Sequence, residues 1–389
     1  MNELIQTPMT PAMLRGAAYT RSTDRGLLPA RLPEAALVQG HDDYLNLMAS
    51  QTTGVRLALR TAATVIEVDV VATRTVHHGA PVGPSGLFDL LIDGVLAGEA
   101  TASGGASAGV DMASGTVTYS AGTAGNVRFD GLPGREKDIE IWLPHSEVIE
   151  LIELRTDAPV LAAPEASKRV WLHHGSSISH GVHATGHTRT WPAVAAGRAG
   201  VELINLGLNG NALLDPFTAR TLRDTPADLI SAKIGINLVN TDLMRMRAFT
   251  PAVHGFLDTI REGHPDTPLL LVSPIHSPLV EDTPGPTAPD PDFPGLRFKT
   301  LGDPADTAHP VTGRLTLRTI RRELSRIATE RMADDPHLHY LDGLDLYNDT
   351  DFATTPLPDL LHPDTAGHAL IGARFARHAF TGCGPFAAR

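Results

Sequence analysis

The chain has 389 residues, of which 42% are hydrophobic and 20% charged, so it is long enough for two folded domains. Its net charge of −12, with no basic run, argues against a nucleic acid partner. The single cysteine, Cys383, excludes an internal disulfide, and no apolar stretch reaches the roughly 18 residues of a membrane span. The first residues lack the apolar core of a secretion signal. We therefore expect a cytoplasmic protein with no membrane span.

Residues 1–165 are expected to form an all-β sandwich, or jelly roll, with a polar N-terminal arm. Between Gly54 and Asp157, hydrophobic and polar residues alternate with the period of a half-buried strand, as in 64–71 and 137–143. Turns that contain glycine separate these runs, and no run with helical periodicity interrupts them. Several short strands at this spacing are typical of a β-sandwich.

Residues 166–389 follow a proline-containing linker and show a different rhythm. Strand candidates are 169–174, 201–205, 229–236, 269–273 and 337–342, and helix candidates are 191–198, 217–223, 251–262, 314–332 and 364 to about 380. This alternation predicts a parallel sheet covered by helices on both faces. Residues 278–310 interrupt it with eight prolines, and we expect them to form a surface insertion.

Four polar elements come just after predicted strands or before the last helix. They are Ser177 in Gly-Ser-Ser, Gly210 in Asn-Leu-Gly-Leu-Asn-Gly, Asn237 in Gly-Ile-Asn, and the pair Asp359 and His362 in Asp-Leu-Leu-His. The carboxyl ends of parallel strands meet at one edge of the sheet, where ligands bind. We therefore expect these side chains to lie in one crevice.

This set of residue types suits acyl transfer. The Ser177 hydroxyl needs a base, which His362 can supply, and the Asp359 carboxylate can hold the imidazole in one tautomer. The backbone N–H groups of Ser177 and Gly210 and the side-chain amide of Asn237 can stabilise the negative oxygen of a tetrahedral intermediate.

The four blocks, in this order, resemble those of the SGNH (GDSL-type) hydrolases over residues 168–389. The resemblance implies a flavodoxin-like three-layer α/β/α domain, and an esterase, lipase, deacetylase or acyltransferase that needs no cofactor. Two positions depart from the family pattern: Ser176 and Leu238 each replace an Asp. The strand-rich first half is similar in placement to the jelly-roll domain of some carbohydrate esterases.

Several residues near these blocks admit two interpretations. Ser176 is adjacent to the expected nucleophile, although alignment on Gly175 favours Ser177. Ser176, Asn211 and Trp191 are weaker candidates to line the substrate site, and core packing is an equal interpretation for Trp191. Histidines cluster at positions 173, 174, 180, 183 and 187. Glycines at 181 and 186 disfavour a helix there, and no cysteine or group of carboxylates completes a ligand set, so we predict no metal.

The sequence therefore predicts a serine carboxylic-ester hydrolase that acts through an acyl-enzyme. The expected substrate is a short acyl ester, such as an acetyl ester, of a carbohydrate or hydroxylated metabolite. One alternative is an acyltransferase that uses the same Ser-His-Asp site. Another is an inactive hydrolase that serves as a glycan- or partner-binding protein. The oligomeric state is left open.

Overall fold

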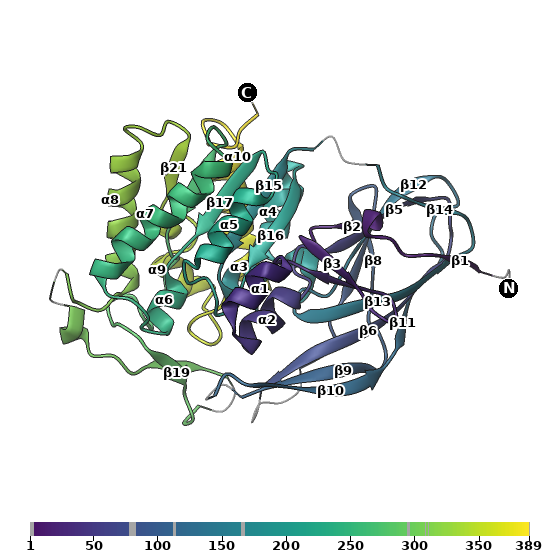
Figure 1. Ribbon diagram of the computed structural model, residues 1–389, viewed down its shortest axis with the longest axis horizontal. Helices are drawn as coiled ribbons and strands as arrows, with labels where there is room; N and C mark the ends of the chain where they lie inside the picture. The colour runs from purple at the N-terminus through teal and green to yellow at the C-terminus, as the bar shows by residue number, and fades with distance from the viewer. Residues whose placement is uncertain are drawn as a thin grey trace. The chain divides into compact units, whose positions relative to one another are not determined.

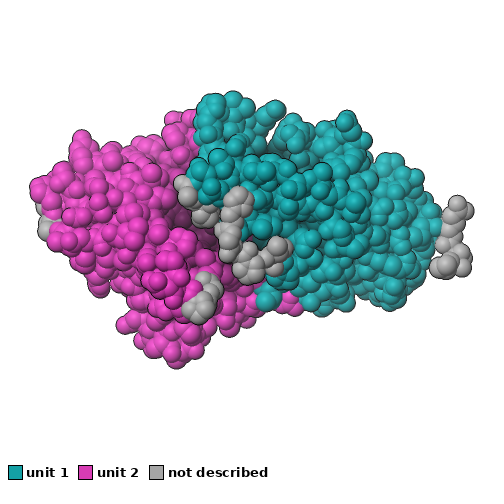
Figure 2. All heavy atoms as spheres, turned by 90° about the horizontal axis from the view of Figure 1, so that it is seen from below, with its two compact units in different colours: residues 1–167, 185–188, 204–206 teal, residues 168–184, 189–203, 207–389 magenta. Residues whose placement is uncertain are grey.

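The computed structural model describes residues 4–77, 83–111, 114–164, 168–293, 296–307, 309 and 311–388. It contains two compact units, coloured separately in Figure 2: residues 1–167, 185–188 and 204–206 form the first, and residues 168–184, 189–203 and 207–389 form the second. The predicted domain boundary at residues 165 and 166 lies outside the described residues and stays a prediction. No helix in the described part of the chain is long and apolar enough to cross a membrane.

The first unit contains most of the strands. They are β1 (Ile5–Thr7), β2 (Leu14–Arg15), β3 (Tyr19–Ser22), β4 (Leu27–Ala30), β5 (Arg56–Thr61), β6 (Ile66–His77), β7 (Phe88–Ile92), β8 (Val95–Ala100), β9 (Gly105–Val110), β10 (Val117–Thr123), β11 (Gly125–Phe129), β12 (Lys137–Trp142), β13 (Glu147–Thr156) and β14 (Val160–Ala162). The larger sheet has the order β10-β9-β6-β13-β4-β3, with β1 on β13 and β11 on β6, and the smaller has the order β14-β5-β12-β7-β8, with β2 on β5.

The two sheets bury one common core, which confirms the predicted β-sandwich. In β6, Ile66, Val68 and Val70 are fully buried, whereas Glu67 and Asp69 between them point to the other face and pair with Arg155. This alternation follows from the two-residue period of a strand. Ile66, Val68 and Val70 share one apolar cluster with side chains of β5, β7 and β12 from the smaller sheet.

Two helices of the first unit precede the alternating region. They are α1 (Glu34–Gly40) and α2 (Asp43–Ser50), which depart from the all-β structure expected for residues 1–165. The Asp42 side chain caps α2 by accepting hydrogen bonds from the N–H groups of Tyr44 and Leu45, which otherwise lack partners at a helix start.

The second unit is built on a five-stranded parallel sheet. The strands of this sheet are β15 (Val170–Gly175), β16 (Glu202–Gly207, of which residues 204–206 are grouped with the first unit), β17 (Leu229–Lys233), β18 (Leu269–Val272) and β21 (Leu338–Leu341), in the order β16-β15-β17-β18-β21. Its long helices are α4 (Trp191–Ala199), α5 (Pro216–Asp224), α7 (Met246–Gly263), α8 (Leu317–Arg331) and α10 (Thr365–Phe380). Its shorter elements are α3 (Ser177–His180), α6 (Ile236–Asn240), α9 (Asp349–Thr354), β19 (Thr287–Pro289) and β20 (Phe298–Thr300).

Helices cover both faces of this sheet (Figure 1). On one face, Trp171 of β15 stacks on Phe375 of α10, with ring centroids 5.0 Å apart, and Trp191 of α4 lies 5.0 Å from the same ring. On the other face, the ring of His174 lies 5.9 Å from Phe256 of α7. The order β16-β15-β17-β18-β21 is the flavodoxin-like 2-1-3-4-5 arrangement. The predicted three-layer α/β/α fold is therefore confirmed.

The predicted start of the third helix at Pro251 is wrong. Helix α7 begins at Met246 and contains Pro251 in its interior. Phe249, which precedes the proline, is buried on the same face as Val253 and Phe256. Packing of this apolar face therefore continues the helix through the proline, although proline removes one helical hydrogen bond.

The predicted insertion at 278–310 has structure of its own in its described part. Strands β19 and β20 pair antiparallel, with Ala288 opposite Lys299. Thr300 donates a hydrogen bond to the carbonyl of Pro284, and Leu301 N–H bonds Pro286 O. These bonds stabilise the insertion internally, and the N–H of Phe298 in β20 bonds the carbonyl of Asp359, outside the insertion.

Candidate active site

Ser177 lies at the carboxyl edge of the parallel sheet, directly after β15. The chain turns there into α3, and the carbonyl of Ser176 accepts hydrogen bonds from the N–H groups of Ser179 and His180. Close approach explains the glycine at the end of β16: a Cβ at Gly207 would fall 2.5 Å from the backbone nitrogen of His180. The first turn after Ser177 is therefore packed tightly on the neighbouring strand.

The structure brings together the three side chains of the predicted triad. The Ser177 Oγ lies 2.9 Å from Nε2 of His362, and Nδ1 of His362 lies 2.6 Å from Oδ2 of Asp359. These contacts give His362 one tautomer, with Nδ1–H donating to the carboxylate and Nε2 accepting from the hydroxyl. This is the arrangement that can deprotonate a serine hydroxyl.

Ser177 is distinguished from its neighbour Ser176 by this contact. The Oγ of Ser176 is buried and has no hydrogen-bond partner among the described residues. Ser177 and His362 keep 3% and 7% of their surface exposed, whereas Ser176 is fully buried. The geometry supports Ser177 as the nucleophile in the predicted register.

The Asp359 carboxylate is held by an unusual backbone turn. Its Oδ1 accepts hydrogen bonds from the N–H groups of Leu361 and His362, at 2.9 and 2.7 Å. Leu360, which directly follows Asp359, has a φ of +68°, in the left-handed region that a non-glycine residue rarely adopts. The Ser277 hydroxyl donates to the Leu360 carbonyl at 2.8 Å and helps to hold this conformation. The turn sets the distance between the carboxylate and the imidazole.

A second histidine contacts the same carboxylate. Nε2 of His183 lies 3.1 Å from Oδ2 of Asp359, and the rings of His183 and His362 meet edge to face with centroids 5.6 Å apart. Burial raises the pKa of Asp359, but the hydrogen bonds from His183 and His362, with the His362 charge, outweigh it and hold that pKa well below its ordinary value. Asp359 is therefore ionised at neutral pH.

The histidine cluster of the sequence divides into separate roles. Ligand atoms of His183, Asp359 and His362 lie within 4.8 Å of one another, a spacing that a cation could bridge, but the hydrogen bonds among them account for their positions. His173 is instead fully buried. In the first unit, His187 donates from Nδ1 to the carbonyl of Leu143 and accepts from Gly54 N–H at Nε2, as a neutral structural residue.

Gly210 lies in the loop that follows β16, and Asn237 lies in the first turn of α6, which follows β17. Asn237 Oδ1 accepts a hydrogen bond from Ala212 N–H at 3.0 Å, which assigns the two ends of its amide and directs Nδ2 away from Ala212. Gly210 has a φ of +72°, in the left-handed region. Among the described residues, no acceptor pairs with Asn237 Nδ2 or with the N–H groups of Gly210 and Ser177. These three donors are available to a ligand.

The weaker substrate-lining candidates receive less support. Trp191 is fully buried and packs between the rings of Trp171, His173 and Phe375, which is the core-packing interpretation. Asn211 is 4% exposed, and its side-chain amide donates to the carbonyl of Asn209. Neither position supports direct substrate contact.

Phe298 of the insertion is a neighbour of His362 that sequence reasoning missed. Its ring centroid lies 6.0 Å from that of His362, and its backbone N–H bonds the Asp359 carbonyl at 3.3 Å. The contact His183–Asp359 was also missed. No sequence motif marks either contact. Phe298 lies in a proline-rich stretch, and His183 is 176 positions from Asp359 in the sequence.

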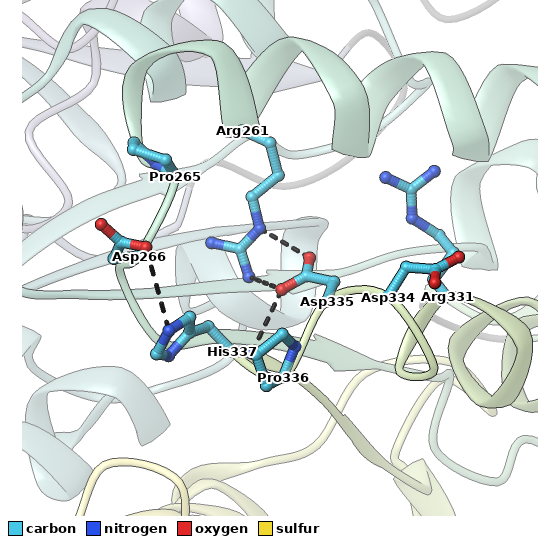
Figure 3. A pocket seen from close by; sticks show the side chains of 8 residues that line it. All are labelled: Arg261, Pro265, Asp266, Arg331, Asp334, Asp335, Pro336 and His337. Carbon is cyan, nitrogen blue, oxygen red and sulfur yellow. Dashed lines mark hydrogen bonds and ion pairs between the residues drawn. The ribbon is translucent and has the colours of Figure 1, made fainter.

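A pocket of about 580 Å³ lies elsewhere on the second unit, before β18 and β21 (Figure 3). Several of its charged groups pair with one another: Arg261 makes two hydrogen bonds to Asp335, and His337 lies 3.9 Å from Asp266. Because it lies at the amino ends of the strands, it is at the edge of the sheet opposite Ser177, and it contains none of the predicted site residues.

The comparisons with known proteins agree with this geometry. A family model described as the GDSL-like lipase/acylhydrolase family matches residues 174–370. Among solved structures, the salicylyl-acyltransferase SsfX3 from a tetracycline biosynthetic pathway is 29% identical, with a TM-score of 0.76 over 96% of this chain and 95% of that one. No curated protein matches.

Two further solved structures show the fold alone. A putative GDSL-like lipase from Bacteroides ovatus is 18% identical, with a TM-score of 0.64 and 96% of each chain covered. A family two carbohydrate esterase from Clostridium thermocellum is 13% identical, with a TM-score of 0.55 over 84% of this chain and 91% of that one. The family model spans just over half of the chain and establishes that the protein belongs to the GDSL-like lipase/acylhydrolase family.

Proposed function

We propose that the protein transfers an acyl group from a carboxylic ester through an acyl-enzyme at Ser177, with water as the usual acceptor. The observation that carries this proposal is the continuous chain of contacts from Ser177 Oγ to His362 and on to Asp359, at 2.9 and 2.6 Å. Membership of an acylhydrolase family supports the same chemistry.

In the first half of the reaction, Ser177 Oγ attacks the ester carbonyl carbon while its proton moves to His362 Nε2. The carbonyl electron pair moves to the oxygen, and the resulting oxyanion accepts hydrogen bonds from Ser177 N–H, Gly210 N–H and Asn237 Nδ2. Collapse of this intermediate breaks the ester C–O bond, and the leaving alkoxide takes the proton from His362. Asp359 stays ionised and stabilises the imidazolium.

In the second half, a water molecule gives its proton to His362 and adds to the acyl carbon. The new tetrahedral intermediate uses the same three donors, and each such donor is worth about 3–4 kcal/mol in related enzymes. Collapse releases the carboxylic acid and returns the proton to Ser177 Oγ. We propose a short acyl ester of a carbohydrate or hydroxylated metabolite as substrate; the carbohydrate esterases of the same fold support this choice.

Acyl transfer to an alcohol other than water is the second candidate. The salicylyl-acyltransferase that is 29% identical over nearly the full chain supports it. The chemistry differs only in the acceptor that reaches the acyl-enzyme: an alcohol in place of water forms a new ester and releases no acid. An aromatic acyl donor therefore belongs in any substrate panel.

The test is intact-protein mass spectrometry after treatment with a fluorophosphonate, on the wild type, Ser177→Ala and Ser176→Ala. We expect one adduct on the wild type and on Ser176→Ala, and none on Ser177→Ala. Acetyl, butyryl and salicyl esters, each with and without added alcohols, then separate hydrolysis from transfer. If the wild type takes up no label and hydrolyses no ester, the proposed enzymatic activity is refuted. That outcome would favour the alternative of an inactive hydrolase that binds a glycan or a partner protein.

A further inference from the structure

His183 is placed so that it joins the segment of the nucleophile to the carboxylate of the triad. It follows Ser177 by six residues, in the turn that ends α3, and Val182 N–H donates to the Ser177 carbonyl at 3.1 Å. From there its Nε2–H reaches Oδ2 of Asp359, the oxygen that also accepts from His362 Nδ1–H. One carboxylate oxygen is thus shared by two imidazoles.

The backbone at His183 is held in a disfavoured conformation. Its φ is +69°, in the left-handed region. The preceding carbonyl, of Val182, accepts a hydrogen bond from Nε2 of His368 in α10 at 2.9 Å, and Ala184 N–H bonds the Gly181 carbonyl at 3.0 Å. Bonds on both sides therefore hold the residue in a conformation that presents its ring to Asp359.

We propose that His183 is a positioning residue for the acyl-transfer reaction at Ser177, and this inference rests on the proposed function. Its ring donates one N–H to Asp359 and fixes the carboxylate relative to the turn that carries the nucleophile. Oδ1 of Asp359 is already held by its own loop through Leu361 and His362 N–H. The bond from His183 adds a second link between this loop and the turn of Ser177, beside the contact of His362 Nε2 with Ser177 Oγ. Its role is to keep Ser177 Oγ within reach of His362 Nε2.

The role makes a prediction about turnover rather than binding. The His183 side chain is about one-third exposed, so its removal opens no large cavity. Loss of the charge-assisted hydrogen bond from His183 to Asp359 should lower kcat about tenfold. A bond of this kind typically changes an equilibrium constant or a rate constant by about a factor of ten. KM should stay within about twofold, since the ring makes no proposed contact with the ester.

The experiment compares His183→Ala, His183→Gln and His183→Asn with the wild type. Gln can place an amide N–H where Nε2–H of the imidazole lies, whereas Asn tolerates the left-handed backbone but is too short to reach. We expect Gln to recover most of the turnover, and Ala and Asn to share its loss. His41, an exposed histidine at the end of α1 with a φ of +45°, provides the matched control. His41→Ala changes the same kind of backbone position without a contact to Asp359, and kcat should not change.

The readouts are kcat and KM on an ester that the wild type turns over, the rate of fluorophosphonate labelling, and the melting temperature. Wild-type turnover in His183→Ala, or Gln no better than Ala, would overturn the inference while leaving the proposed function intact. A loss that follows only the melting temperature across the variants would also overturn it, since a purely structural role predicts that pattern. Failure of the wild type to be labelled would instead refute the proposed function itself.

Discussion

Two serine–histidine networks each include residues of the segment 173–179 and differ in chemistry. His362 bonds one serine, Ser177, and one carboxylate. His173 bonds two serines, Ser179 through Nε2 and Ser231 through Nδ1, at 2.8 and 2.7 Å. Among the described residues, no carboxylate bonds His173. The comparison shows that a Ser–His contact alone does not identify a nucleophile.

Burial explains the difference between the two networks. His173, Ser179 and Ser231 are fully buried, so an ester carbonyl cannot reach either hydroxyl. Burial also lowers the pKa of His173 well below its ordinary value, with the neighbouring charges of His174 and Lys233 adding to the effect. A neutral histidine that no carboxylate supports is a poor base, since nothing stabilises its imidazolium. The first network is suited to proton transfer and the second to holding the turn after Ser177.

The largest expected effect comes from removing the carboxylate that only one network has. Asp359→Asn should lower kcat about 10³- to 10⁴-fold, because an amide does not enforce the tautomer of His362 or stabilise its charged form. The measurement is kcat with a soluble ester, beside a circular dichroism melt to verify folding. Retention of more than a tenth of the activity would show that His362 works without its carboxylate.

Removal of a serine from the buried network should change stability instead. Ser231→Ala leaves Trp171 Nε1–H and a ring nitrogen of His173 without their partner, which costs about 1–3 kcal/mol of unfolding free energy for each buried group. We expect kcat to change by less than about threefold. Urea unfolding checks the first part and an ester assay the second.

Ser176→Ala is the matched control for Ser231→Ala. It removes a buried hydroxyl that has no partner among the described residues, so it should leave the unfolding free energy nearly unchanged. Equal destabilisation by the two variants would contradict the role assigned to the His173 network.

The two networks should also respond to acid in different pH windows. The folded pKa of His173 lies below its unfolded value, so protons bind preferentially to the unfolded chain as pH falls through about 6.5. The contribution of His173 to the free energy of unfolding is therefore fully present above that pH. It decreases as the pH is lowered further, by up to about 1.4 kcal/mol per pH unit. The folded pKa of Asp359 is also lowered, so its contribution is complete above about pH 4 and is lost in more acid solution.

Urea unfolding at several pH values between 4.5 and 7.5 measures how the free energy of unfolding changes over the range in which His173 is expected to titrate. His173→Gln should reduce the slope there, and the remaining slope should include His187, whose pKa burial also lowers. An unchanged slope in His173→Gln would mean that His173 does not titrate in this way.

The smallest expected effect concerns Phe298, the aromatic neighbour of His362 in the first network. Phe298→Ala removes an aromatic ring that meets the ring of His362 with centroids 6.0 Å apart. We expect kcat/KM to fall about three- to tenfold, because such aromatic contacts contribute about 0.5–1.5 kcal/mol. An ester series from acetyl to octanoyl and salicyl would reveal whether the loss depends on the acyl group. Phe293→Ala, a more exposed position in the same insertion, should leave the series unchanged.

Much of the fold and of the site could be predicted because the signals are local or ordered along the chain. Alternation in β6 marks its buried face, and the blocks around Ser177 and His362 occur in the order of a known family. The contact of His183 with Asp359 could not be predicted, since it depends on a left-handed turn and on residues 176 positions apart. Trp191 was ambiguous because an aromatic residue has the same sequence signature in a core as in a pocket.

The left-handed conformation of Leu360 has a consequence for evolution and for engineering. A glycine there would relieve a left-handed backbone conformation that costs a non-glycine residue on the order of 1–3 kcal/mol. Yet the same residue is the link between Asp359 and His362, and the added freedom would loosen the spacing between acid and base. Leu360 is therefore a position where selection for heat resistance and selection for rapid turnover favour different residues.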